Sequence, residues 1–350
     1  KVKKMTDTIK IDARNMEFSG VMINGKSVKF KNSGKTLDLF EGFKKGKNKL
    51  TFSYFAKPKQ TLYFTGEGEN LQIWTQGQGR YTSHWLPSFD DVNEKVVFNL
   101  SVKFQNGYKI LSNGVLKNVD HIRNGHENGF STYNYQMQNP MSSYLLMLAI
   151  GYFEKQTATT KSGTPLEFYV DKNDVSKFEP TYRYSKELFD YLEKEIGVKY
   201  PWEVYRQVPV RDFLYAGMEN TTSTIFSQDF VVDSIGFNDR NYINVNAHEL
   251  AHQWFGDLIT AQSGKHHWLQ EGFATYYALL AERHLFGEDY FYEALNDYAQ
   301  QLKRASTTDS IPVMNEKASS LSFYKKGAWA LHVLREDIGI KNFQKAVKKY

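Results

Sequence analysis

The hydrophobic pattern in the first half of the chain is that of β-strands. Apolar and polar side chains alternate with a period of two, which is typical of strands with one buried face. The clearest run is Phe98, Leu100, Val102 and Phe104. Asn-Gly dipeptides favour tight hairpin turns, and five occur in this half, at Asn24, Asn106, Asn113, Asn124 and Asn128. The pattern predicts a mostly antiparallel β domain over residues 1–154.

In the second half, apolar side chains recur at helical spacing instead. Two long helices are predicted over 241–254 and 268–286. Each is followed by a glycine that can end it, Gly256 and Gly287. This half therefore predicts a mainly helical second domain over residues 155–350, and the whole chain is expected to be of the α+β multidomain class.

Two segments near the expected boundary complete this division. The apolar run 144–152 predicts a buried strand, and the small polar residues of 155–163 predict a linker. Segment 340–350 is amphipathic and stops without a capping residue, so we expect the chain to be a C-terminally truncated fragment of a longer protein.

Composition narrows the class of protein. The chain has 350 residues, 41% hydrophobic and 24% charged, which suits a globular protein of two domains. No run of 18 apolar residues occurs, so no membrane span is predicted. The net charge is +5, but the lysines are scattered and we expect no nucleic-acid partner. Without cysteine, disulfides and thiolate ligands are excluded. We expect a soluble chain, cytoplasmic or periplasmic, with no signal segment.

One pentapeptide, His-Glu-Leu-Ala-His from His248 to His252, indicates a metal site. On a helix these histidines lie on one face, so both imidazoles can bind one zinc ion, which in catalytic sites keeps a position open for water. Glu249 lies on the flank of that face, where a carboxylate can take a proton from the water. Glu271, in the first turn of the next predicted helix, is the candidate third ligand. The alternative is a helix with two surface histidines and a solvated glutamate.

Several motifs extend this pattern over most of the chain, from about Leu71 to Leu334. They are H-E-L-A-H-Q-W-F-G from His248, W-L-Q-E-G-F-A-T-Y from Trp268, A-G-M-E-N from Ala216, Y-P-W from Tyr200, Y-K-K-G-A from Tyr324 and T-Q-G-Q-G from Thr75. Together they resemble the gluzincin zinc aminopeptidases typified by aminopeptidase N and the leukotriene-processing hydrolase. Two positions depart from that family: Gln270 stands where most members have Asn, and Gln78 where many have Glu.

The resemblance implies a fold and an activity. The fold is a saddle-like N-terminal β domain followed by a thermolysin-like catalytic domain, here incomplete, and we expect a bacterial-type member. The activity is zinc-dependent hydrolysis of the N-terminal peptide bond, with one zinc ion, Glu249 as general base and peptides with a free N-terminus as substrates.

The resemblance also implies roles for residues outside the metal site. Glu219 pairs with the substrate's ammonium group, which needs a partner once desolvated. Gln78 assists it, with one negative charge fewer than a glutamate. Gly217 and Met218 belong to the same substrate-binding segment, and Gly217 lets the backbone approach the substrate. Tyr324 donates a hydrogen bond to the developing oxyanion.

Each of these roles has a plainer alternative. Glu219 could be a solvated loop carboxylate, Gln78 a polar turn residue and Tyr324 a core tyrosine. Glu316 is a weaker candidate for the subsite beyond the scissile bond. The remaining histidines considered lack ligand spacing and are expected at the surface or behind the ligands: His266, His267, His284 and His332.

Two other functions stay open at this stage. An epoxide hydrolase on the same scaffold would need a long apolar channel and dedicated groups, which the sequence does not display. A catalytically dead peptide-binding module is the second, but every expected catalytic position is filled.

Overall fold

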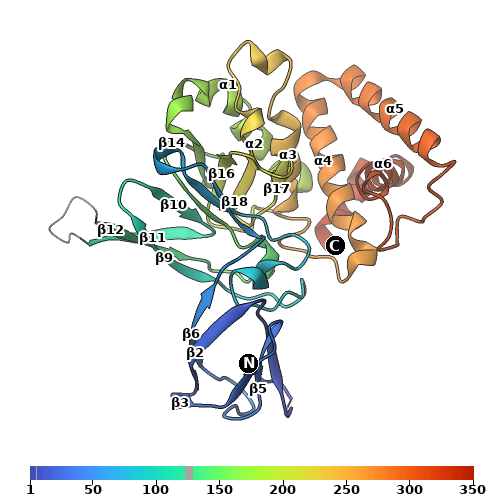
Figure 1. Ribbon diagram of the computed structural model, residues 1–350. Helices are drawn as coiled ribbons and strands as arrows, with labels where there is room; N and C mark the ends of the chain where they lie inside the picture. The colour runs from blue at the N-terminus through green and yellow to red at the C-terminus, as the bar shows by residue number, and fades with distance from the viewer. Residues whose placement is uncertain (5, 123–128) are drawn as a thin grey trace.

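The N-terminal part of the protein is built of antiparallel sheets. The computed structural model describes residues 1–4, 6–122 and 129–350. Two small sheets form the outer end (Figure 1), with strand orders β1(Ile9–Asp12)-β5(Thr36–Leu39)-β4(Phe30–Asn32) and β3(Lys26–Ser27)-β2(Met16–Ile23)-β6(Leu50–Ala56). Two further sheets follow, β10(Lys109–Ser112)-β13(Leu148–Gly151)-β8(Gln72–Thr75)-β7(Leu62–Thr65) and β11(Val115–Ile122)-β12(Phe130–Gln136)-β9(Asn99–Gln105).

The N-terminal part contains the predicted alternation and several of the predicted turns. Leu100, Val102 and Phe104 of the predicted run lie on β9, and Phe98 comes just before it; the residues of β9 alternate between exposed and half-buried. Asn24 and Gly25 both have positive φ, 53° and 81°, as a two-residue hairpin turn requires. Gly107 and Gly114 also have positive φ. The pairs at Asn124 and Asn128 lie outside the described residues.

The second part combines a mixed sheet with helices. The sheet has the order β14(Phe153–Thr159)-β15(Pro165–Asp171)-β16(Tyr205–Val210)-β18(Ser223–Ser227)-β17(Gly217–Met218), with β15, β16 and β18 parallel. The helices are α1(Phe178–Tyr182), α2(Ser185–Ile196), α3(Ile243–His252), α4(Trp268–Phe286), α5(Glu288–Ala305), α6(Gly327–Ile338) and α7(Ile340–Lys349). Figure 1 shows α3 to α6 gathered on one side of the molecule. An antiparallel β-rich part followed by a helical part confirms the α+β prediction.

Three predicted elements need correction. The expected linker 155–163 is mostly strand β14 and its turn, because β14 pairs with β15 along its whole length. Within the expected strand 144–152, only Leu148–Gly151 is a strand, and Ser143–Leu145 forms a turn of 3₁₀ helix. The first long helix is shorter than predicted, Ile243–His252. The domain boundary at residue 154 stays a prediction.

One hydrophobic core joins both parts and contains α4. Its members range from Trp74 in β8 to Val347 in α7. Residues 270–282 of α4 are buried without interruption, so this helix is packed on all sides. Gly272 allows a close contact, because a Cβ there would lie 3.0 Å from the Cα of Gly327. That approach brings the start of α6, and with it the preceding segment Ser322–Lys326, against α4. In the part of the chain described, no helix has both the length and the apolar character needed to cross a bilayer.

Candidate functional site

Three predicted ligand atoms converge between α3 and α4. His248 Nε2 and His252 Nε2 lie 3.1 Å apart, and Glu271 Oε2 lies 3.4 Å and 3.3 Å from them. Tetrahedral ligands bound at about 2.0–2.1 Å are separated by about 3.3–3.4 Å. Glu271 Oε2 is buried and accepts no hydrogen bond from the described part of the chain. Two imidazole nitrogens and one carboxylate oxygen are a donor set that zinc takes in catalytic sites, so these residues fit a zinc ion.

The surrounding groups orient the ligands. His252 Nδ1 lies 2.9 Å from the carbonyl oxygen of Phe255, which favours the tautomer that leaves Nε2 free for an ion. The other carboxylate oxygen of Glu271 lies 3.2 Å from His267 Nε2. His267, expected at the surface or behind the ligands, therefore stands directly behind Glu271.

The electrostatics of the triad favour a bound cation. Burial would raise the pKa of Glu271, but His252, His248 and His267 outweigh burial and hold that pKa well below its usual value. The Glu271 carboxylate is therefore charged. Burial would lower the pKa of His252, but the carboxylates of Glu271 and Glu219 hold it well above its usual value. Negative charge thus dominates around His252.

Glu249 lies beside the triad, as the helix geometry predicted. It is buried, and burial raises its pKa well above the usual glutamate value. A carboxylate with a raised pKa is a better proton acceptor near neutral pH. Gly217 lies against it: a Cβ on this glycine would lie 2.4 Å from Glu249 Oε1.

Nearly all the predicted site residues line one cleft of about 300 Å³. Its lining consists of Gln78, Tyr215, Ala216, Gly217, Glu219, His248, Glu249, His252, Glu271 and Tyr324. Met218 is the exception among the predicted residues, because its side chain is buried and its sulfur accepts a hydrogen bond from Gln76 Nε2 at 3.3 Å. Glu316 is not part of this lining either. Its neighbour is Gly264, whose added Cβ would lie 3.4 Å from Glu316 Cβ.

Glu219 is held by residues that sequence reasoning missed. Tyr144 donates its hydroxyl hydrogen to Glu219 Oε1 at 3.2 Å, and Gln253 Nε2 donates to the Glu219 carbonyl at 3.1 Å. Burial, then the charge of Glu219, raises the pKa of Tyr144 well above its usual value, so the hydroxyl stays a donor. The sequence signal for Tyr144 is poor, because it sits in an apolar run that reads as core. Gln253 follows the second histidine and could have been suspected only from that position.

Tyr324 lies over the first ligand. Its ring is parallel to that of His248, with an angle of 9° and centroids 5.6 Å apart. Burial, and then the carboxylates of Glu271 and Glu219, raise the pKa of its hydroxyl. The hydroxyl therefore keeps its proton and can donate it. Tyr324 sits in a π-helical turn, Ser322–Lys326, a feature that is frequent at functional sites.

Two other histidines lie outside the cleft; His284 is at the surface, as expected, but His332 is buried. His284 pairs with Glu187 at 3.2 Å and stacks on Tyr191. His332 packs against Tyr276, with ring centroids 6.0 Å apart.

The chain is similar to known proteins in sequence and in structure. A model described as "Peptidase family M1 domain" matches residues 181–350, and one described as "Peptidase M1 N-terminal domain" matches residues 1–145. A leucyl aminopeptidase of Saccharolobus solfataricus is 26% identical over 98% of this chain and 45% of its own length. A glutamyl aminopeptidase of Sus scrofa is 28% identical over 76% of the chain and 29% of its own. The chain thus spans less than half the length of these relatives.

Solved structures support the fold. An M1 zinc metallopeptidase from Deinococcus radiodurans matches with a TM-score of 0.78 and 22% identity, covering 98% of this chain and 78% of the other. A two-domain M1 zinc metallopeptidase mutant bound to L-tryptophan matches with a TM-score of 0.82 at the same identity and the same coverage of both chains.

Proposed function

The chain belongs to peptidase family M1, and on that basis we propose that it is a zinc-dependent aminopeptidase that hydrolyses the N-terminal peptide bond of peptides. The observation that carries the proposal is the meeting of three zinc-type ligand atoms with two further carboxylates, Glu249 and Glu219, in one cleft. The first carboxylate suits proton transfer and the second suits a cationic substrate terminus. The relatives named as aminopeptidases support the same activity.

His248, His252 and Glu271 would hold one zinc ion. When bound, zinc supplies Lewis acidity that polarises a carbonyl and lowers the pKa of water. Glu249 then accepts the proton of the attacking water and passes it to the leaving amine. Tyr324 donates a hydrogen bond to the substrate carbonyl oxygen as negative charge develops there.

Glu219 explains why the proposed cut is at the amino end. Glu219, Glu249 and His252 each offer one atom within 4.8 Å of the other two. An ammonium group paired with Glu219 therefore places the first peptide bond beside the general base and the ligands, and later bonds out of reach. Gln78, which also lines the cleft, offers a neutral acceptor to the ammonium group.

The two alternative functions are less well supported. A cleft lined by carboxylates and imidazoles favours a charged peptide terminus over an apolar epoxide. A dead binding module would not require Glu249 beside the ligands. Neither alternative has an observation of its own in its favour.

Release of a chromogenic amine from a panel of aminoacyl p-nitroanilides tests the proposal. The zinc-loaded protein should release it, a chelator should stop the release, and added zinc should restore it. N-acetylated counterparts should be far poorer substrates. A zinc-loaded protein that binds peptides and hydrolyses none of the panel would be a binding module. Equal cleavage of free and acetylated substrates would indicate an endopeptidase.

A further inference from the structure

We propose that Thr222 is a positioning residue that fixes the amine-binding carboxylate of Glu219 against the β domain. This inference rests on the proposed function, because it assigns Glu219 to the substrate's ammonium group. It concerns a residue that lies outside the cleft lining and is fully buried.

The backbone at Thr222 is in an unusual conformation for its residue type. Strands β17 and β18 form a hairpin whose loop is 219–222. Ser223 N donates to the Asn220 carbonyl at 2.9 Å and closes a tight turn. Thr222, the third residue of this turn, has a φ of 67°. A left-handed residue at this position is normally glycine or asparagine, and a β-branched residue is an outlier.

The hydroxyl of Thr222 supplies a reason for a threonine there. Its Oγ1 accepts a hydrogen bond from Gly114 N at 2.7 Å, in the turn between β10 and β11 of the N-terminal part. Asn113, in the same turn, donates from Nδ2 to the carbonyl of Thr221 at 2.6 Å. Glycine would relax the backbone but could not accept the first of these bonds.

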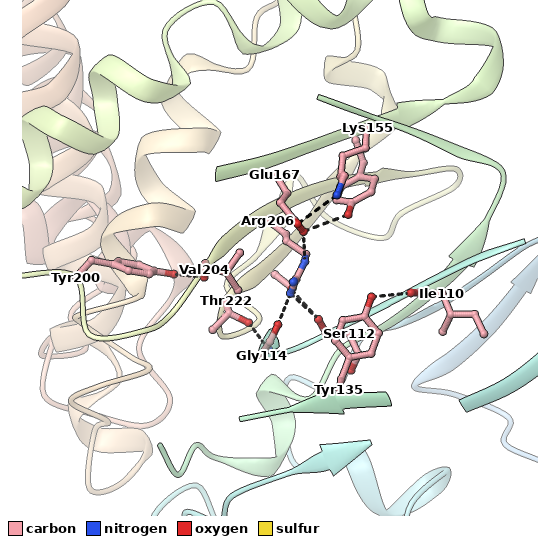
Figure 2. A network of polar contacts seen from close by, with 12 residues as sticks. Ile110, Ser112, Gly114, Tyr135, Lys155, Glu167, Tyr200, Val204, Arg206 and Thr222 are labelled. Atoms are coloured by element: carbon pink, nitrogen blue, oxygen red, sulfur yellow. Dashed lines mark hydrogen bonds and ion pairs between the residues drawn. The ribbon is translucent and has the colours of Figure 1, made fainter. Parts of the chain in front are cut away.

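Figure 2 shows that this turn is also hydrogen-bonded to the mixed sheet, through Arg206. Arg206 of β16 donates from Nη1 to the carbonyls of Ser112 and Gly114, at 3.1 Å and 2.5 Å. Its Nε pairs with Glu167 Oε2 of β15 at 2.5 Å. Arg206 is fully buried, so its charge needs these partners. The turn therefore gives Thr222 a fixed partner.

The turn that contains Asn113 is also linked to Glu219, through Leu145 and Tyr144. The carbonyl of Leu145 accepts from Asn113 Nδ2 at 3.0 Å and from Asn220 Nδ2 at 3.2 Å. The preceding residue, Tyr144, holds the Glu219 carboxylate.

On the opposite side of the loop, Gln253 accepts from Thr222 N at 2.8 Å and donates to the Glu219 carbonyl. Gln253 follows the ligand His252 in sequence. The loop is therefore held between the β domain and the ligand helix, and both set the distance from Glu219 to the ligands.

Three variants of the full-length protein test this role: Thr222→Ser keeps the hydroxyl, Thr222→Val removes it at similar volume, and Thr222→Gly removes it and relaxes the backbone. The probes are L-leucine hydroxamate and its des-amino analogue, 4-methylpentanohydroxamate. Both offer a hydroxamate to the metal, but only the first offers an ammonium group to Glu219. The ratio of their inhibition constants therefore measures the amine site alone.

We expect the parent and Thr222→Ser to share a large preference for the amine-bearing probe. Thr222→Val and Thr222→Gly should reduce it by roughly tenfold, the scale of a misplaced binding group. Zinc content should be unchanged. In Thr222→Gly the midpoint of thermal unfolding should fall little, because relief of the backbone offsets the lost hydrogen bond. A lost preference at a nearly unchanged unfolding midpoint would separate a positioning role of Thr222 from a role in stability. Thr222→Gly also keeps the test valid if Thr222→Val does not fold.

The two ways of failing are distinct. A parent with no preference for the amine-bearing probe contradicts the proposed amine site and with it this inference. A preference in the parent that survives in Thr222→Gly, measured well below its unfolding midpoint, contradicts the positioning role alone.

Discussion

Gly217 leaves the space that the carboxylate of Glu249 occupies. A Cβ on Gly217 would lie 2.4 Å from Glu249 Oε1 and 2.6 Å from its Cδ, distances that real Cβ atoms do not reach. Strand β17 and helix α3 are in contact here. A glycine in the A-G-M-E-N segment therefore does more than let the backbone approach the substrate. It also leaves room for the side chain of the proposed general base, Glu249.

The first prediction is that Gly217→Ala lowers turnover by displacing Glu249. We expect kcat to fall by about tenfold or more, because a small misplacement of a catalytic group is costly. Zinc content should stay near the parent value, since the ligands are untouched. Gly236→Ala is the control, because its Cβ would meet nothing closer than 3.5 Å. Parent-like kcat in Gly217→Ala would show that Glu249 has room to move.

A second prediction removes the proton acceptor without changing its shape. Glu249→Gln should keep zinc and fold but lose on the order of 10²-fold or more in kcat, the usual scale for a general base. Metal analysis and circular dichroism on the same sample provide the control. Turnover near that of the parent would mean that another group activates the water.

The metal site gives the third prediction. The parent protein should contain about one zinc per chain. His252→Ala should lose most of it, because only two ligands remain. His284→Ala is the matched control, since His284 pairs with Glu187 outside the cleft. Full zinc retention in His252→Ala would overturn the ligand assignment.

The sequence could predict those parts of the site that depend on residues close together in the chain. Two histidines four residues apart share a helix face whatever surrounds them, and α4 runs from Trp268 to Phe286 as the pattern predicted. Tyr144 could not be predicted as a partner of Glu219, because 75 residues separate them and a tyrosine in an apolar run reads as core. Strand β14 was mistaken for a linker, because its outward residues are polar and its pairing with β15 is set by the sheet.

The fourth prediction concerns acid stability. Burial would raise the pKa of Glu167, but the charges of Arg206 and Lys155 outweigh burial and lower it. A depressed folded-state pKa means that this carboxylate stabilises the fold above its unfolded pKa of about 4.3. That contribution is lost as the pH falls through the folded-state value. Denaturant unfolding between pH 7 and pH 3 should show the loss.

Glu167→Gln checks this assignment. It leaves Arg206 buried without its anionic partner, which typically costs about 3–5 kcal/mol of unfolding free energy. The variant should be less stable at pH 7 and lose less than the parent on acidification. Glu179→Gln breaks an exposed pair with Arg183 and should change little. If Glu167→Gln loses as much unfolding free energy as the parent between pH 7 and pH 3, the pH dependence belongs to other groups.

The last prediction concerns cleavage at the amino end only. Losing one partner of a buried charge pair costs about 3–5 kcal/mol, less if water enters. At about 1.4 kcal/mol per tenfold, Glu219→Ala should lower kcat/KM on free-amine substrates by roughly 10²-fold or more. N-acetylated substrates carry no charge to pair, so their poor cleavage should barely change and the gap between the two classes should narrow. Glu187→Ala, outside the cleft, is the control. A gap of unchanged width in Glu219→Ala would place the amine site elsewhere.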